Sequence, residues 1–262
     1  DGSIEVIPFD TCYVDVSAVG GEVLFHQVEL LSGRLHGMLE GVADSTGFFE
    51  GNVSLNSEDL RLVPAQWNLP AIRGRLNGQG AVKGPVENLD FAGWVNLYDF
   101  RLGPLGARSA ALALMVDDVL GYQRVTTGID GKGISLRGVP FGDFSLWGSA
   151  DPASARVDSF RTVRGDTNVF FSVQADYSDT LTGIRVADFQ VNLEGTLWSI
   201  DDPVNLTVGA THFSLPQMRL SSDQGAMSLS GLYEKDRVVA GSLQLESFDL
   251  ALLNPFTHLE RD

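Results

Sequence analysis

A stretch of strict two-residue alternation constrains the fold of this chain more than any other feature. From Ile72 to Gly84, apolar residues and glycines occupy every second position, and mostly polar or charged residues occupy the positions between them. Pro85 ends this run, and a second alternating run extends from Leu89 to Leu97. A period of two is typical of a strand that buries one face. We therefore expect two neighbouring β-strands in this stretch.

Glycines recur on the apolar side of these runs, at Gly74, Gly78, Gly80 and Gly93. The whole chain contains 29 glycines in 262 residues, more than the average share of about 7%. Glycine inside a strand weakens it, so repeated glycine indicates a tight bend or the close approach of another group. We interpret that group as an acyl chain or a partner strand.

The same alternation continues through most of the sequence and predicts some fifteen strands. We expect strands at Leu60–Val63, Ala107–Leu114 and Ile184–Leu197, among others. An open sheet rarely exceeds about ten strands, and no segment has the helical period needed to cover its apolar side. The sheet must then fold its apolar face onto itself as a sandwich, a barrel or a trough. Glycine on that face favours an all-β antiparallel meander curled into a U-shaped trough with an apolar interior.

A loose repeat accompanies the strands. Similar sequences close four segments, with the first two about 40 residues apart, a period typical of repeat arrays. They are Leu60-x-Leu62-x-Pro64, Phe100-x-Leu102-x-Pro104, Phe213-x-Leu215-Pro216 and Leu250-x-Leu252-x-x-Pro255. We interpret residues 1–262 as a single elongated segment built from degenerate repeats of about 40 residues.

Charge and composition exclude several classes of protein. The net charge of −16 argues against a nucleic-acid partner, because phosphate contacts require a basic face. A single cysteine, Cys12, leaves no intramolecular disulfide framework and no cysteine metal cluster. No stretch reaches about 18 consecutive apolar residues, and the chain begins with Asp1 in a strand-like segment. We infer a piece of a longer protein whose targeting segment lies elsewhere.

The search for reactive chemistry leads us to expect no enzyme, no metal and no cofactor. Gly78-x-Gly80-x-x-x-Gly84 has the wrong third spacing for a dinucleotide-binding loop, and no helix follows it. No Gly-x-Ser-x-Gly motif occurs. The histidines have no metal-ligand spacing and are expected at the surface; they are His26, His36, His212 and His258. Adjacent carboxylates such as Asp117-Asp118 and Asp201-Asp202 are expected in solvated turns.

Four tryptophans could stack on sugars, although packing in the core or at the rim is the commoner role of such residues. They are Trp67, Trp94, Trp147 and Trp198.

The Gly-x-Leu strands, the turn at Gly84-Pro85-Val86 followed by Leu89–Gly93, and the ending at Leu243–Pro255 resemble the translocation and assembly module TamB family, which belongs with the AsmA-like, bridge-like envelope proteins. The resemblance extends over most of residues 30–256 and consists of recurring, degenerate sequence patterns. It implies a β-taco trough with a lipid-accommodating interior, in a long periplasmic protein whose inner-membrane anchor lies outside this fragment. It further implies phospholipid transport towards the outer membrane, or assistance to outer-membrane protein assembly with an Omp85-type partner.

Our first hypothesis is a non-enzymatic periplasmic conduit that binds phospholipid acyl chains. The expected lining residues all fall on the apolar sides of strands: Phe91, Val95, Leu97, Leu112, Leu114, Phe171, Val173, Phe189, Val191, Leu193, Val208, Leu229 and Leu243. The second hypothesis is a scaffold or chaperone for outer-membrane β-barrel or autotransporter assembly, acting through exposed edge strands. The third is a secreted adhesin or carbohydrate-binding β-sandwich.

Overall fold

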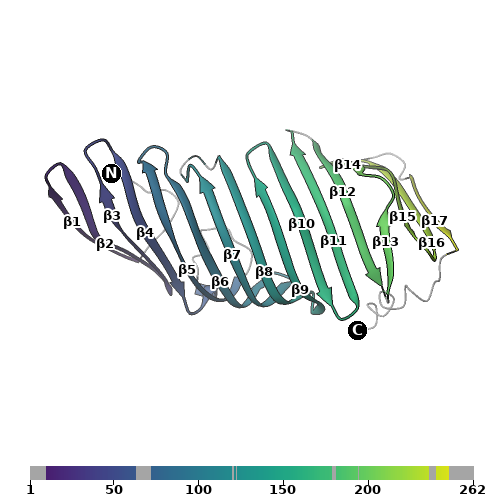
Figure 1. The fold of residues 1–262 in the computed structure, drawn as a ribbon, viewed down its shortest axis with the longest axis horizontal. Coiled ribbons are helices and arrows are strands. Elements are labelled where there is room, and N and C mark those ends of the chain that lie inside the picture. Colours follow the sequence, from purple (N-terminus) through teal and green to yellow (C-terminus); the bar gives the residue numbers. More distant parts are fainter. Residues whose placement is uncertain are drawn as a thin grey trace. The chain divides into compact units, whose positions relative to one another are not determined.

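The computed structural model describes residues 10–62, 72–119, 121, 123–178, 181–193, 195–235 and 240–247. In this part of the chain the structure is all-β apart from one short 3-10 helix, and neighbouring strands run antiparallel in sequence order, as a meander (Figure 1). The expected all-β antiparallel meander is therefore confirmed. The chain divides into two compact units, Asp1–Pro152 and Ala153–Asp262. The organisation of residues 1–262 as one segment of repeats stays a prediction.

In the first unit nine strands follow one another, and each pairs with the next along the chain. The elements are β1 (Thr11–Val19), β2 (Glu22–Ser32), β3 (Leu35–Ala43), β4 (Phe48–Ser57), the 3-10 helix η1 (Leu60–Leu62), β5 (Ile72–Pro85), β6 (Asp90–Leu102), β7 (Leu105–Asp117), β8 (Arg124–Leu136) and β9 (Val139–Ala150).

The alternation that predicted β5 is reproduced in its side-chain exposure. Leu76, Gly78, Gly80 and Val82 are half-buried or buried, whereas the residues that alternate with them are exposed. The register aligns Val82 with Phe91 of β6, and Phe91 with Val116 of β7, so apolar residues of successive strands form rows on one side of the sheet. We call this side the apolar face of the first unit and the opposite side its polar face.

The chain's own aromatic rings account for the close approach expected at the glycines. A Cβ atom at Gly80 or Gly93 would lie 2.6 Å from Cζ of Phe91. A Cβ at Gly51 would lie at the same distance, 2.6 Å, from Cζ of Phe49. Glycine leaves the space that each ring fills, so neither an acyl chain nor a partner strand is needed to explain glycine at these three positions.

The strands of the second unit pair in the same sequential order. They are β10 (Ser154–Arg164), β11 (Thr167–Tyr177), β12 (Leu181–Leu193), β13 (Thr196–Ile200), β14 (Val204–Gly209), β15 (His212–Ser222), β16 (Gly225–Glu234) and β17 (Ala240–Glu246).

Two short strands share one position in this sheet. β13 pairs with the end of β12 and β14 with its beginning, and both also pair with β15. A bend at residues 201–203 separates them, and Pro203 within it has no backbone N–H for a ladder. The amide of Asp201 still donates a hydrogen bond to the carbonyl of Arg219 at 3.1 Å.

Three local predictions are wrong. Leu60–Leu62 forms a 3-10 turn, because the side chain of Asp59 accepts hydrogen bonds from the backbone and side chain of Arg61. The strand expected over residues 184–197 is interrupted at Gly195, whose φ of 87° lies in the left-handed region and reverses the chain. Pro216 lies inside β15, at a bulge, and does not end a strand.

Two other local predictions are confirmed. Ala107–Leu114 lies within β7. Phe100–Pro104 closes β6 and turns into β7. The segment endings at Pro64 and Leu250–Pro255 lie outside the described residues.

Candidate functional site

The candidate lining residues of the first unit lie together on its apolar face. β6 contributes Phe91, Val95 and Leu97, and β7 contributes Leu112 and Leu114. Val95 is directly opposite Leu112 in the antiparallel register. All five side chains are half-buried, because one side of each contacts neighbouring strands while the other is not fully covered.

The candidates of the second unit also share one side of their sheet, which we call its apolar face. Phe171 of β11 is opposite Phe189 of β12, and Leu229 of β16 is opposite Leu243 of β17. Val173 and Val191 lie on the same side by the two-residue alternation of their strands. Val208 joins them because a bulge in β12 against β11 places Val186 and Thr182, the latter paired with Val208, on that side. The side chain of Leu193 lies outside the described residues.

The sequence reasoning missed several residues on this face. Trp198 is opposite Val191 and is 3% exposed, and Leu220, which is 7% exposed, is opposite Met227. Their period-two spacing was visible in the sequence, but only the pairing register places them beside the predicted residues. Trp198 therefore has a packing role.

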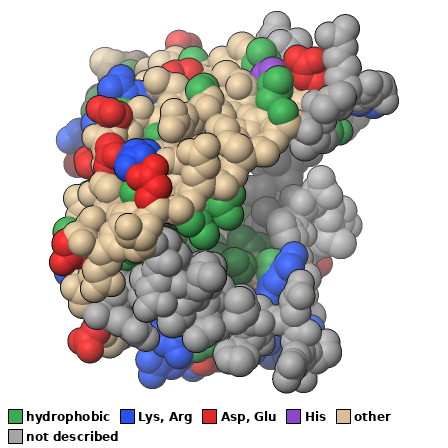
Figure 2. All heavy atoms as spheres, turned by 90° about the vertical axis from the view of Figure 1, so that its right-hand side faces the viewer, with side chains coloured by type: hydrophobic (Ala, Val, Ile, Leu, Met, Phe, Trp, Pro, Cys, Tyr) green, Lys and Arg blue, Asp and Glu red, His purple; other side chains and the backbone are tan. Residues whose placement is uncertain are grey.

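Apolar exposure increases towards the last strands of the second unit. Val208 is 37% exposed, Leu229 is 42% exposed and Leu243 is 60% exposed. The space-filling view from the side of this unit shows hydrophobic side chains exposed at its surface (Figure 2). Such hydrocarbon surface is available for contact with another apolar group.

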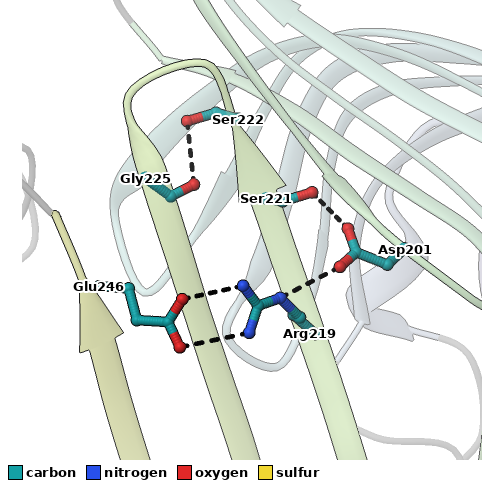
Figure 3. Close-up of polar contacts among 6 residues, drawn as sticks. All are labelled: Asp201, Arg219, Ser221, Ser222, Gly225 and Glu246. Atoms are coloured by element: carbon teal, nitrogen blue, oxygen red, sulfur yellow. Dashed lines mark hydrogen bonds and ion pairs between the residues drawn. The ribbon is translucent and has the colours of Figure 1, made fainter.

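A charged cluster occupies the polar face of the second unit (Figure 3). The guanidinium of Arg219 donates a hydrogen bond to Oε2 of Glu246 at 2.9 Å, and its Nε lies 3.2 Å from Oδ2 of Asp201. Ser221 donates a further hydrogen bond to Asp201. Since Glu246 is two strands away, Arg219 must reach across β16, where the small Ala226 and Ser228 are buried.

The contacts within this cluster shift the pKa values of Glu246 and Arg219. The hydrogen bond and charge of Arg219 lower the pKa of the Glu246 carboxyl from its ordinary value of 4.5. The hydrogen bond and charge of Glu246 in turn raise the pKa of Arg219. Both groups therefore stay charged at neutral pH, as expected of an ion pair and not of a proton-transfer site.

The remaining ionisable candidates are dispersed. His36 lies 2.7 Å from a carboxylate oxygen of Glu29, and His26 lies 2.8 Å from the hydroxyl of Ser17. His212 lies 3.2 Å from Thr207, and His258 lies outside the described residues. No group of three or more potential metal ligands occurs among the described residues. The Gly78–Gly84 motif lies inside β5, and the part of the chain that the structure describes places no helix N-terminus beside it.

No protein-family model, curated protein or solved structure is significantly similar to this chain. Within the described residues, no helix has the length and apolar character needed to cross a membrane.

Proposed function

We propose that the apolar faces of the two units bind phospholipid acyl chains and form a segment of a lipid conduit. The observation that carries this proposal is the exposure of Leu229 and Leu243 on a continuous apolar face. Within each unit the described strands belong to one meander, so the residues that the structure describes supply no second sheet to cover that face. A curled, open trough would leave these faces accessible to lipid.

Acyl chains suit this surface energetically. Burial of each methylene contributes about 0.8 kcal/mol, so a chain can be held without a charged side chain. Rows of similar Leu, Val and Phe side chains give nearly equal binding at successive positions. A lipid would then move along them with small free-energy changes at each step, and no catalytic residue is required.

The cellular setting of the proposal comes from the resemblance to the TamB and AsmA-like proteins. Under this proposal the segment lies in the periplasm, its parent protein is anchored in the inner membrane, and an Omp85-type protein is a candidate partner at the outer membrane. The net charge of −16 supports a partner other than nucleic acid.

Site-specific photo-crosslinking tests this function. A crosslinking residue at Val191 or Leu229 is expected to capture phospholipid, whereas one at Asn192, the neighbour of Val191 on the opposite side of β12, is expected not to. Equal lipid capture from Val191 and Asn192 would contradict the proposal. Mass spectrometry of the purified chain is expected to detect co-purifying phospholipid, and a Val191→Asp variant is expected to lose most of it.

A second candidate function rests on the exposure of β17. All seven residues of this strand are exposed, including Leu243 and Leu245. An exposed strand edge can accept an extended segment of another protein through backbone hydrogen bonds. A role as an assembly scaffold predicts crosslinks from β17 to a client protein, with none to lipid from Val191 or Leu229.

A further inference from the structure

The polar face of the first unit carries a row of side chains that the lipid proposal does not use. The register aligns Met38, Ser54, Gln79, Trp94, Ala113, Gly128 and Trp147, one from each of β3 to β9. Trp94 is 38% exposed and Trp147 is 51% exposed. Two large indoles are therefore exposed on the side of the sheet where the two-residue alternation predicts polar residues.

The residues between the two indoles leave a low, flat surface. Ala113 and Gly128 separate Trp94 from Trp147. A Cβ at Gly128 would lie 2.7 Å from the ring of Trp147, so the indole lies over the glycine backbone and presents its other surface to solvent. Trp94 and Trp147 are three strand intervals apart, or about 14 Å, which is the length of a short oligosaccharide.

Polar groups surround Trp94. A depression of about 460 Å³ beside it is lined by Glu40, Asn52, Ser54 and Gln79, among others. The row next to Trp94 aligns the amides of Asn56, Asn77 and Asn96 with Asp130 of β8. These groups supply hydrogen-bond donors and acceptors of the kind that pair with hydroxyl groups.

Together these features match the chemistry of a sugar chain. A sugar ring has apolar C–H faces that stack on the electron-rich face of an indole, and hydroxyl groups at its edge that require polar partners. The described lining of the depression includes the carboxylate of Glu40 and no Lys or Arg, so it disfavours phosphorylated or acidic ligands.

We propose that the polar face of the first unit binds a neutral oligosaccharide. Trp94 and Trp147 form the stacking platform, and Gln79, Asn52 and Glu40 hydrogen-bond to the sugar hydroxyls. Within the first unit this site lies on the opposite side of the sheet from the candidate lipid-binding residues.

Titration of the whole chain with cellohexaose, chitohexaose and maltohexaose tests the proposal, with calorimetry and tryptophan fluorescence as readouts. At least one of the three is expected to bind saturably at millimolar concentration or below. Trp94→Ala and Trp147→Ala are each expected to weaken that binding at least tenfold, and Gln79→Ala to weaken it several-fold. Trp94→Phe is expected to retain most of it, because a stacking face remains.

Tyr177→Ala is the matched control, since it removes an aromatic residue of similar exposure, 48%, from the second unit. Its affinity for the sugar is expected to equal that of the unmodified chain. Thermal unfolding of each variant separates lost binding from lost folding. Saturable binding of none of the three hexasaccharides would overturn the proposal, as would equal losses in Tyr177→Ala and the tryptophan variants at unchanged stability.

Discussion

In the first unit several glycines of the apolar face lie beneath aromatic rings, whereas in the second unit two aromatic rings of neighbouring strands stack on each other. In the first, the ring of Phe91 occupies the space over Gly80 and Gly93. In the second, the rings of Phe160 and Phe171 stack with centroids 4.5 Å apart, and no atom lies within 4 Å of a Cβ built at Gly183. A larger residue would therefore clash at Gly93 of the first unit and would enter open space at Gly183 of the second.

The largest expected effect follows from adding volume at Gly93. A Cβ there would lie 2.5 Å from the carbonyl oxygen of Gln79 and 2.6 Å from the Phe91 ring. Because the carbonyl belongs to the backbone, it cannot rotate away. We expect Gly93→Val to reduce the free energy of unfolding by about 3 kcal/mol, measured by urea denaturation.

Gly183→Val in β12 is the control for this change. Open space around Gly183 and the strand preference of valine predict an effect within about 0.5 kcal/mol of zero. Equal destabilisation by the two valine substitutions would show that the units do not differ in the way described above.

The next effect concerns the aromatic stack of the second unit. Phe171→Ala removes the stack with Phe160 and the cross-strand contact with Phe189. Because Phe171 is only half-buried, we expect a loss of about 2 kcal/mol, less than for a fully buried ring. Hydrogen-exchange mass spectrometry should show the lost protection in β10–β12. Loss confined to β5–β7 would contradict this assignment.

A double-mutant cycle in the first unit isolates the glycine–ring pairing. A Cβ at Gly131 would clash with the ring of Phe144, which supplies all three of its nearest atoms. Gly131→Ala is expected to cost about 1 to 2 kcal/mol in the unmodified chain and much less in a Phe144→Ala background. Additive losses in urea denaturation would mean that the ring does not determine the need for glycine.

The smallest effect is the pH dependence of the Arg219–Glu246 pair. The folded-state pKa of Glu246 is lowered from 4.5, so its stabilising contribution is fully present above that value and is lost as the pH falls through the lower folded-state pKa. The melting temperatures of the unmodified chain and Glu246→Gln should differ at neutral pH and converge in acid. A difference that persists in acid would exclude this ionisation as its cause.

Period-two patterning predicted the faces of the strands well, since it reports a local property of each strand. Ile72–Gly84 became β5 with the expected side half-buried, and Ala107–Leu114 lies in β7 despite its alanines. The candidate lining residues fell on one face in each unit for the same reason.

Features that depend on pairing or on a single backbone angle could not be predicted in this way. The interruption after β12 depends on the left-handed conformation of Gly195. From the sequence alone, Gly195 fitted the two-residue alternation of the strand predicted over residues 184–197. The Arg219–Glu246 contact joins residues 27 positions apart and depends on the small Ala226 and Ser228 between them. The tryptophan row likewise appears only when the register of seven strands is known.

The bend between β13 and β14 makes this position of the second unit's sheet a natural place for insertions. β13 takes its alignment from residues 190–193 of β12 and β14 takes its own from residues 181–186, so neither depends on the number of residues between Ile200 and Val204. Extra residues after the exposed Asp202 would lengthen a surface loop without turning any side chain to the wrong side of the sheet. Evolution or an engineer could therefore add a new element here while both flanking ladders keep their alignment.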